Sequence, residues 1–200
     1  MKNGTITRRA LLLGGLALST TGCMSTIQDV VQQPVPVALN AENYRVDPRY
    51  RKQRVPYEGG EAPGTIVVNT SEFYLYHVEE GGWATRYGVG VGEQGLTLKG
   101  KAKIGRKAEW PSWTPTANML RRKPHLVQYA GGVEGGLNNP LGARALYLYR
   151  GNRDTMFRIH GTNEPWSIGN AMSSGCIRLT NDDIVDLYER TPVGATVVVI

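Results

Sequence analysis

The hydrophobic positions after residue 63 mostly follow the two-residue period of β-strands. Runs rich in β-branched or aromatic residues occur at 65–70, 72–78, 83–91, 144–150, 155–160 and 196–200. Glu80-Gly81-Gly82 and Gly151-Asn152 separate neighbouring runs, and such sequences are typical of hairpin turns. The pattern predicts a mainly β domain with a sandwich or barrel-like architecture.

One short helix is predicted near the C-terminus. Thr180 or Asn181 is suited to cap its first turn, and Asp182 and Asp183 would stabilise that turn by their negative charge. The residues with the spacing of one apolar helical face are Ile184, Leu187 and Tyr188.

Residues 110–142 are rich in Gly, Pro, Asn and Trp and show neither period. Loops of this length in a compact domain tend to be functional. Trp110 and Trp113 in this segment either line a substrate groove or anchor the loop on the core.

The N-terminal sequence is typical of an export signal. Residues 1–22 combine Arg8 and Arg9 with a short apolar run and a tail of small residues, which is too short for a membrane span. Cys23 follows a small residue, as in a bacterial lipoprotein, and is expected to be either lipidated or a free thiol of the tail. Residues 23–62 are polar and contain scattered prolines, which predicts a tether or an arm wrapped on the domain at 63–200.

The charge of the whole chain gives little reason to expect a nucleic acid partner. The 200 residues carry a formal net charge of +6, but 1–22 hold three basic and no acidic side chains. The chain after residue 22 contains no stripe of Lys and Arg with interleaved aromatic residues. Two cysteines exclude a disulfide-rich or cysteine-rich zinc module, and no short spacing joins His77, His125 and His160 into a zinc site. We therefore predict no metal and no cofactor.

The candidate chemistry lies in two segments. Alternation along 155–160 places His160 at a strand end on the face opposite Ile159, where it is suited to be a base. Cys176 and Arg178 share a face, roughly 6.5 Å apart if the segment is a strand. A guanidinium favours the thiolate, which is the nucleophilic form, and an imidazole within reach would accept the thiol proton. Residue types alone also fit an inert buried cysteine.

The order of these residues is more specific than their types. His160-Gly161-Thr162, followed by Ser174-Gly175-Cys176-Ile177-Arg178-Leu179 and Asn181, resembles the active-site signature of the bacterial L,D-transpeptidases, cysteine enzymes that remodel peptidoglycan. The segments 107–115 and 139–147 resemble other recurrent sequences of that family. The resemblance covers 63–200, the extent of a full catalytic domain.

The resemblance implies a role for four residues of the signature. Cys176 would be the acylated nucleophile and His160 its general base. The carbonyl of Gly161 would orient the imidazole, as an acidic residue does in other triads. The amides of Gly175 and Cys176 would contribute to an oxyanion hole.

Two further positions are expected at the substrate pocket. Arg178 would shape the pocket or contact substrate. Ser174 stands where many members of the family have a second histidine, so a hydroxyl either replaces that contact or the contact is lost.

The family resemblance also implies the reaction and the compartment. The nucleophile would attack the diamino-acid carbonyl of a tetrapeptide stem, D-alanine would leave, and the acyl group would pass to another stem or to an envelope protein in the periplasm. Membrane contact would come only through the export signal or a lipid on Cys23. The alternatives are an L,D-carboxypeptidase that uses water, a non-catalytic peptidoglycan-binding lipoprotein, and a cysteine peptidase acting on proteins.

Overall fold

The computed structural model describes residues 44–93 and 96–200. The predicted export signal, Cys23 and the first part of the predicted arm lie outside the described residues. Within the described residues no helix has the length and apolar character needed to cross a membrane.

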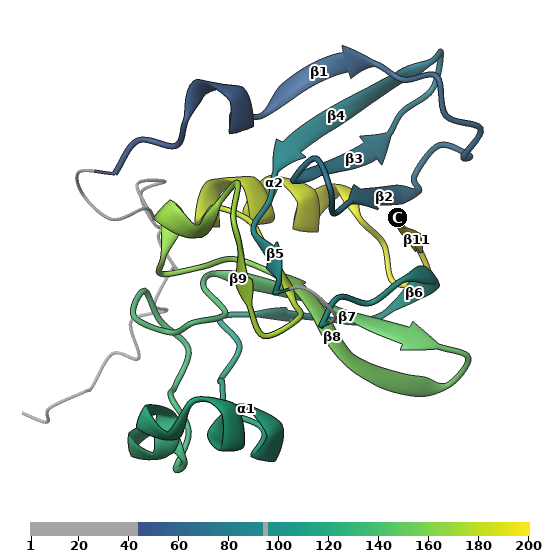
Figure 1. Ribbon diagram of the computed structural model, residues 1–200. Coiled ribbons are helices and arrows are strands. Elements are labelled where there is room, and N and C mark those ends of the chain that lie inside the picture. Colours follow the sequence, from purple (N-terminus) through teal and green to yellow (C-terminus); the bar gives the residue numbers. More distant parts are fainter. Residues whose placement is uncertain (1–43, 94–95) are drawn as a thin grey trace, which may run out of the picture. The chain divides into compact units, whose positions relative to one another are not determined.

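The strands of the described residues are named in chain order (Figure 1). They are β1 Gln53–Pro56, β2 Ile66–Asn69, β3 Tyr74–Val78, β4 Trp83–Gly88, β5 Val91–Gly92, β6 Gly100–Glu109, β7 Arg144–Arg150, β8 Arg153–His160, β9 Ala171–Ser173, β10 Ile177–Arg178 and β11 Thr196–Val199. Nine of them form one mixed sheet in the order β1-β4-β3-β2-β11-β6-β7-β8-β10. β5 and β9 form a small parallel sheet beside it.

The helices of the described residues are short. They are the α-helices α1 Ala117–Arg122 and α2 Asn181–Arg190, and the 3-10 helices η1 Pro48–Tyr50, η2 Pro124–Tyr129 and η3 Pro165–Ser167. The Thr180 hydroxyl caps α2 by accepting from the amide of Asp183 at 3.2 Å. Asn181 is the first residue of the helix, so of the two predicted caps Thr180 is the correct one.

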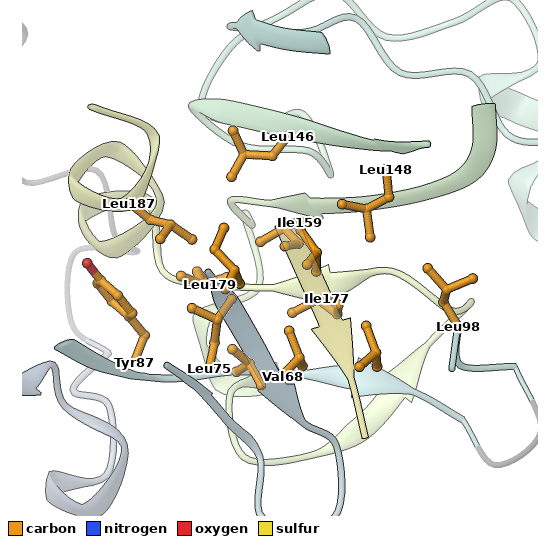
Figure 2. Packing of buried hydrophobic residues seen from close by; sticks show 14 of the residues in the cluster. Val68, Leu75, Tyr87, Leu98, Leu146, Leu148, Ile159, Ile177, Leu179 and Leu187 are labelled. Carbon is orange, nitrogen blue, oxygen red and sulfur yellow. The ribbon is translucent and has the colours of Figure 1, made fainter. Parts of the chain in front are cut away.

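The two halves of the large sheet share one hydrophobic core. Leu146 and Leu148 of β7 face Val68 and Leu75 of the other half, and Ile177 lies between them (Figure 2). All five side chains are almost completely buried. β8 and β10 contribute residues to this core. Their packing there determines the direction in which the other side chains of the two strands point.

The mainly β class predicted from the sequence is confirmed, and each of the six predicted runs contains a strand. Both predicted hairpins are present, joining β3 to β4 and β7 to β8 in antiparallel pairs. The run 83–91 is divided between β4 and β5, because the chain leaves the large sheet at its end and joins the small one.

The sequence pattern missed several elements. The longest strand, β6, was missed because its lysines and glycines hide the alternation of its few buried residues. The prediction of a single helix omitted α1 and the 3-10 helices. The segment 110–142, expected to be loop, contains α1 and η2, and Figure 1 shows α1 set apart from the strands.

Part of the predicted arm belongs to the sheet. β1 pairs with the edge strand β4 in an antiparallel register from Gln53 to Pro56. The 3-10 helix η1 precedes it directly and is drawn in dark blue in Figure 1. The sheet therefore begins before residue 63, where the strand pattern of the sequence starts.

Candidate active site

One pocket of about 660 Å³ brings most of the predicted site residues together. His160, Ser174, Cys176 and Arg178 all line it. The two predicted glycines, Gly161 and Gly175, adjoin these residues in the chain. The other predicted histidines lie elsewhere, His77 in β3 and His125 in η2.

The parallel pairing of β8 with β10 places the base beside the nucleophile segment. Ile159 is paired with Ile177, and His160 with Arg178. Both isoleucines are buried in the core. Since side chains alternate along a strand, His160 and Arg178 point away from that core and into the pocket.

The imidazole of His160 is held by the next residue of the chain. Its Nδ1 lies 2.5 Å from the carbonyl oxygen of Gly161. A carbonyl only accepts, so Nδ1 carries the proton and donates it, and Nε2 presents a lone pair. Burial, and after it the charge of Arg178, lowers the pKa of the imidazole to about 3. The ring is therefore neutral at physiological pH, as a proton acceptor requires.

The thiol of Cys176 is also neutral at rest. Burial raises the pKa of the thiol above its usual value. The Arg158 amide and the charges of Arg158 and Arg178 lower this pKa, and Asp154 raises it. The expected lowering of the pKa by a guanidinium is present, but the cost of burying a thiolate outweighs it.

A serine that the sequence reasoning missed shapes the nucleophile loop. The Ser173 hydroxyl donates to the carbonyl of Cys176 at 2.6 Å and accepts from the amide of Gly175 at 3.1 Å. Ser173 is 2% exposed, so no solvent competes for these bonds. The only signal for it in the sequence is a second serine beside Ser174.

The loop bonds involve an amide of the expected oxyanion hole. The amide of Gly175 was expected in an oxyanion hole, but in this structure it donates to Ser173. Gly175 has φ +130°, and a Cβ there would lie 2.7 Å from the Leu96 carbonyl oxygen and 2.8 Å from Cε1 of Phe157. Glycine is therefore required at this position by backbone conformation and close packing.

Ion pairs hold both arginines of the pocket wall. Arg178 bonds Glu164 at 2.7 Å, and Arg158 bonds Asp154 at 2.7 Å. The Arg158 guanidinium also lies 4.2 Å from the ring centre of Tyr147. Arg178 thus lies on the pocket wall. Its ion pair with Glu164 and the contacts of Arg158 were not predicted from the sequence.

The two faces predicted along β8 are present, although the backbone is irregular in its middle. Met156 has φ +65° and is exposed, and its amide donates to Asp154 Oδ1 at 2.7 Å. The pairing with β7 shifts register between Tyr147 and Tyr149. Phe157 is half-buried against the core, while Ile159 is fully buried as predicted.

The segment around α1 forms part of the pocket wall. Trp113 lines the pocket and meets Tyr129 edge to face, with ring centres 6.1 Å apart. Arg121 and Arg122 of α1 line it as well, and both are exposed. Trp110 is not among the lining residues; its amide bonds the Ala143 carbonyl, which anchors the loop.

The structure thus defines a mainly β protein that presents a cysteine and a histidine in one pocket. Residues 63–200 match the family model of the YkuD L,D-transpeptidase catalytic domain. The chain belongs to this family, as the sequence signature predicted.

Named relatives agree with the family match. The chain is 38% identical to the probable L,D-transpeptidase YbiS of Escherichia coli over 141 residues, which cover 66% of this chain and 43% of YbiS. It is 32% identical to a putative L,D-transpeptidase of Fuscovulum blasticum over 98% of both chains. The match therefore spans less than half of the Escherichia coli relative and nearly all of the Fuscovulum one.

A solved structure from Brucella melitensis is 49% identical, with a TM-score of 0.53, covering 78% of this chain and 96% of that one. That protein is described as a probable carnitine operon oxidoreductase. The description differs from the family shared by this chain and its curated relatives.

Proposed function

We propose that this protein is a peptidoglycan L,D-transpeptidase in which Cys176 is the nucleophile and His160 the general base. The proposal rests on one observation above all. The two residues line one pocket, and the Gly161 carbonyl holds the imidazole with its Nε2 lone pair available. This arrangement supplies a nucleophile, a base and an orienting group, which suffice for acyl transfer.

The reaction has two acyl-transfer steps. The Cys176 sulfur forms a bond to the diamino-acid carbonyl of a tetrapeptide stem as His160 takes the thiol proton. The bond to D-alanine breaks, and the departing amine receives that proton from the imidazolium. An acceptor amine then attacks the thioester, loses a proton to His160, and releases the thiol. The product is a 3–3 cross-link or an envelope protein attached to the wall.

The remaining predicted features belong to the same proposal. The reaction would take place in the periplasm, with membrane contact only through the export signal or a lipid on Cys23. Arg178 and Ser174 lie on the pocket wall that a stem peptide would contact. The oxyanion would form next to Cys176, and the amides of Gly175 and Cys176 are the proposed donors to it.

The test is mass spectrometry of the purified protein with a disaccharide-tetrapeptide. We expect loss of D-alanine, a transient acyl adduct on Cys176, and 3–3 dimers. Cys176→Ala should give neither adduct nor dimer. His160→Gln should slow adduct formation by about 10²–10⁴-fold, the usual contribution of a general base. Tyr57→Ala, an arm variant outside the pocket, serves as the control for folding and handling.

Other products identify the alternatives. Tripeptide alone, even with an added amine acceptor, indicates a carboxypeptidase. Cleavage of ordinary L,L-peptides indicates a cysteine peptidase. Retention of the tetrapeptide without adduct or product indicates a peptidoglycan-binding protein and refutes the proposal.

A further inference from the structure

Glycines of the strand segment 88–92 pack directly against the chain that carries the nucleophile. A Cβ on Gly90 would lie 2.6 Å from the Ser167 carbonyl oxygen, and one on Gly92 would lie 2.7 Å from Cα of Gly175. Both spacings are too short for any side chain. Gly90 also exchanges two backbone hydrogen bonds with Arg178, at 2.8 and 2.9 Å. The segment 88–92 is therefore a close backbone support for the active-site chain.

The N-terminal arm also packs against this support. A Cβ on Gly88 would collide with the backbone and Cβ of Tyr50, and one on Gly169 would collide with the Tyr50 ring. Tyr44 of the arm meets Trp166 edge to face, with ring centres 6.4 Å apart. Tyr50 thus fills the space between the support and the segment 164–170.

The segment 164–170 joins the base to the nucleophile along the chain. Its amide at Gly169 donates to the Val89 carbonyl at 3.0 Å, which fastens it to the support. At its start, Glu164 holds the Arg178 guanidinium. A displacement of this segment would therefore change the pocket wall beside His160 and Cys176 without any direct contact with them.

We infer that Tyr50 is a positioning residue for the active site, through which the N-terminal arm braces the segment 164–170. The inference rests on the proposed function for its catalytic consequence, but the bracing itself concerns only the fold. The arm thereby has a role in the catalytic domain, in addition to any tethering by the residues before it.

The test compares three arm variants by hydrogen exchange and by thiol alkylation. Tyr50→Ala removes the ring, Tyr50→Phe retains it, and Tyr57→Ala is the matched control. Tyr57 is a half-buried tyrosine of the same arm that packs on Tyr76, with ring centres 5.6 Å apart. Tyr50→Leu is a further variant that keeps apolar bulk if the alanine variant does not fold.

We expect exchange of the amides in 164–170 to become about tenfold faster in Tyr50→Ala, with global unfolding still cooperative. Tyr50→Phe should restore slow exchange, and Tyr57→Ala should leave it unchanged. The rate of Cys176 alkylation by iodoacetamide should change only in the Tyr50 variants that lose the ring. With active protein, kcat should fall in the same variants more than KM rises.

Equal exchange in 164–170 for Tyr50→Ala, Tyr50→Leu and Tyr57→Ala would overturn the inference. Faster exchange without altered alkylation would also overturn it, since the brace would then not reach the nucleophile. Both readouts are independent of transpeptidase activity. A failure of the proposed function would instead appear as inactive wild-type protein with the exchange pattern intact.

Discussion

Replacing Ser173 by alanine should destabilise the protein through the nucleophile loop. The hydroxyl makes two hydrogen bonds, to the Gly175 amide and the Cys176 carbonyl. The substitution removes one oxygen and leaves both backbone groups without this partner. Little apolar packing is lost, so the effect isolates the hydrogen bonds.

The magnitude follows from burial. Gly175 is buried, and an unpaired buried donor costs about 1–3 kcal/mol. The Cys176 carbonyl belongs to a half-buried residue and regains part of its bonding from water, so its share is smaller. We expect a total loss of about 2 kcal/mol in the free energy of unfolding. For a chain of this size that loss lowers Tm by about 4–8 °C.

The assay is urea unfolding followed by circular dichroism, with Ser174→Ala as the control. Ser174 is the adjacent serine, half-exposed at the pocket, so its truncation should change stability by less than about 0.5 kcal/mol. Equal stabilities for the two alanine variants would refute the reasoning that the buried hydroxyl holds the loop.

Three further outcomes are expected. His160 takes up a proton near pH 6.5 in the unfolded chain but not in the folded one, so lowering the pH favours unfolding. Between pH 7 and pH 5 the wild type should therefore lose about 2 kcal/mol more free energy of unfolding than His160→Gln. Parallel plots of unfolding free energy against pH for the two proteins would contradict this. Because burial raises the pKa of the Cys176 thiol, its alkylation rate should still be rising at pH 9, and a plateau below pH 8 would show a preformed thiolate. Asn181→Ala should lower the free energy of unfolding in urea by about 1–3 kcal/mol, because the buried amide of Ala143 loses its acceptor, Asn181 Oδ1 at 2.9 Å. A decrease below about 0.5 kcal/mol would exclude that role.

The elements that the sequence predicted are those determined by neighbouring residues. The hairpins follow from turn residues between β-branched runs, and the helix cap at Thr180 follows from a hydroxyl before a periodic segment. The pocket residues His160 and Cys176 were found because a specific signature orders them along the chain. Their alignment then required only the pairing of two adjacent strands.

The features that were missed depend on contacts between distant segments. The sequence of β6 does not show that Ala102 and Ile104 would be buried in the core. The close approach of Gly90 and Gly92 to the active-site chain is a property of the tertiary packing, which glycine permits but does not specify. In the same way, the ion pair of Arg178 with Glu164 depends on the conformation of the loop between them, which the sequence does not give.

The electrostatics of the pocket favour a neutral resting state over an ion pair. Burial raises the pKa of the Cys176 thiol and lowers that of the His160 imidazole, so each shift opposes transfer of the proton before substrate binds. The Arg178 guanidinium is paired with the Glu164 carboxylate. In the proposed reaction, the proton therefore moves as the sulfur–carbon bond forms, and the negative charge passes to the substrate oxygen. A base that is neutral and already oriented by the Gly161 carbonyl is suited to that concerted step.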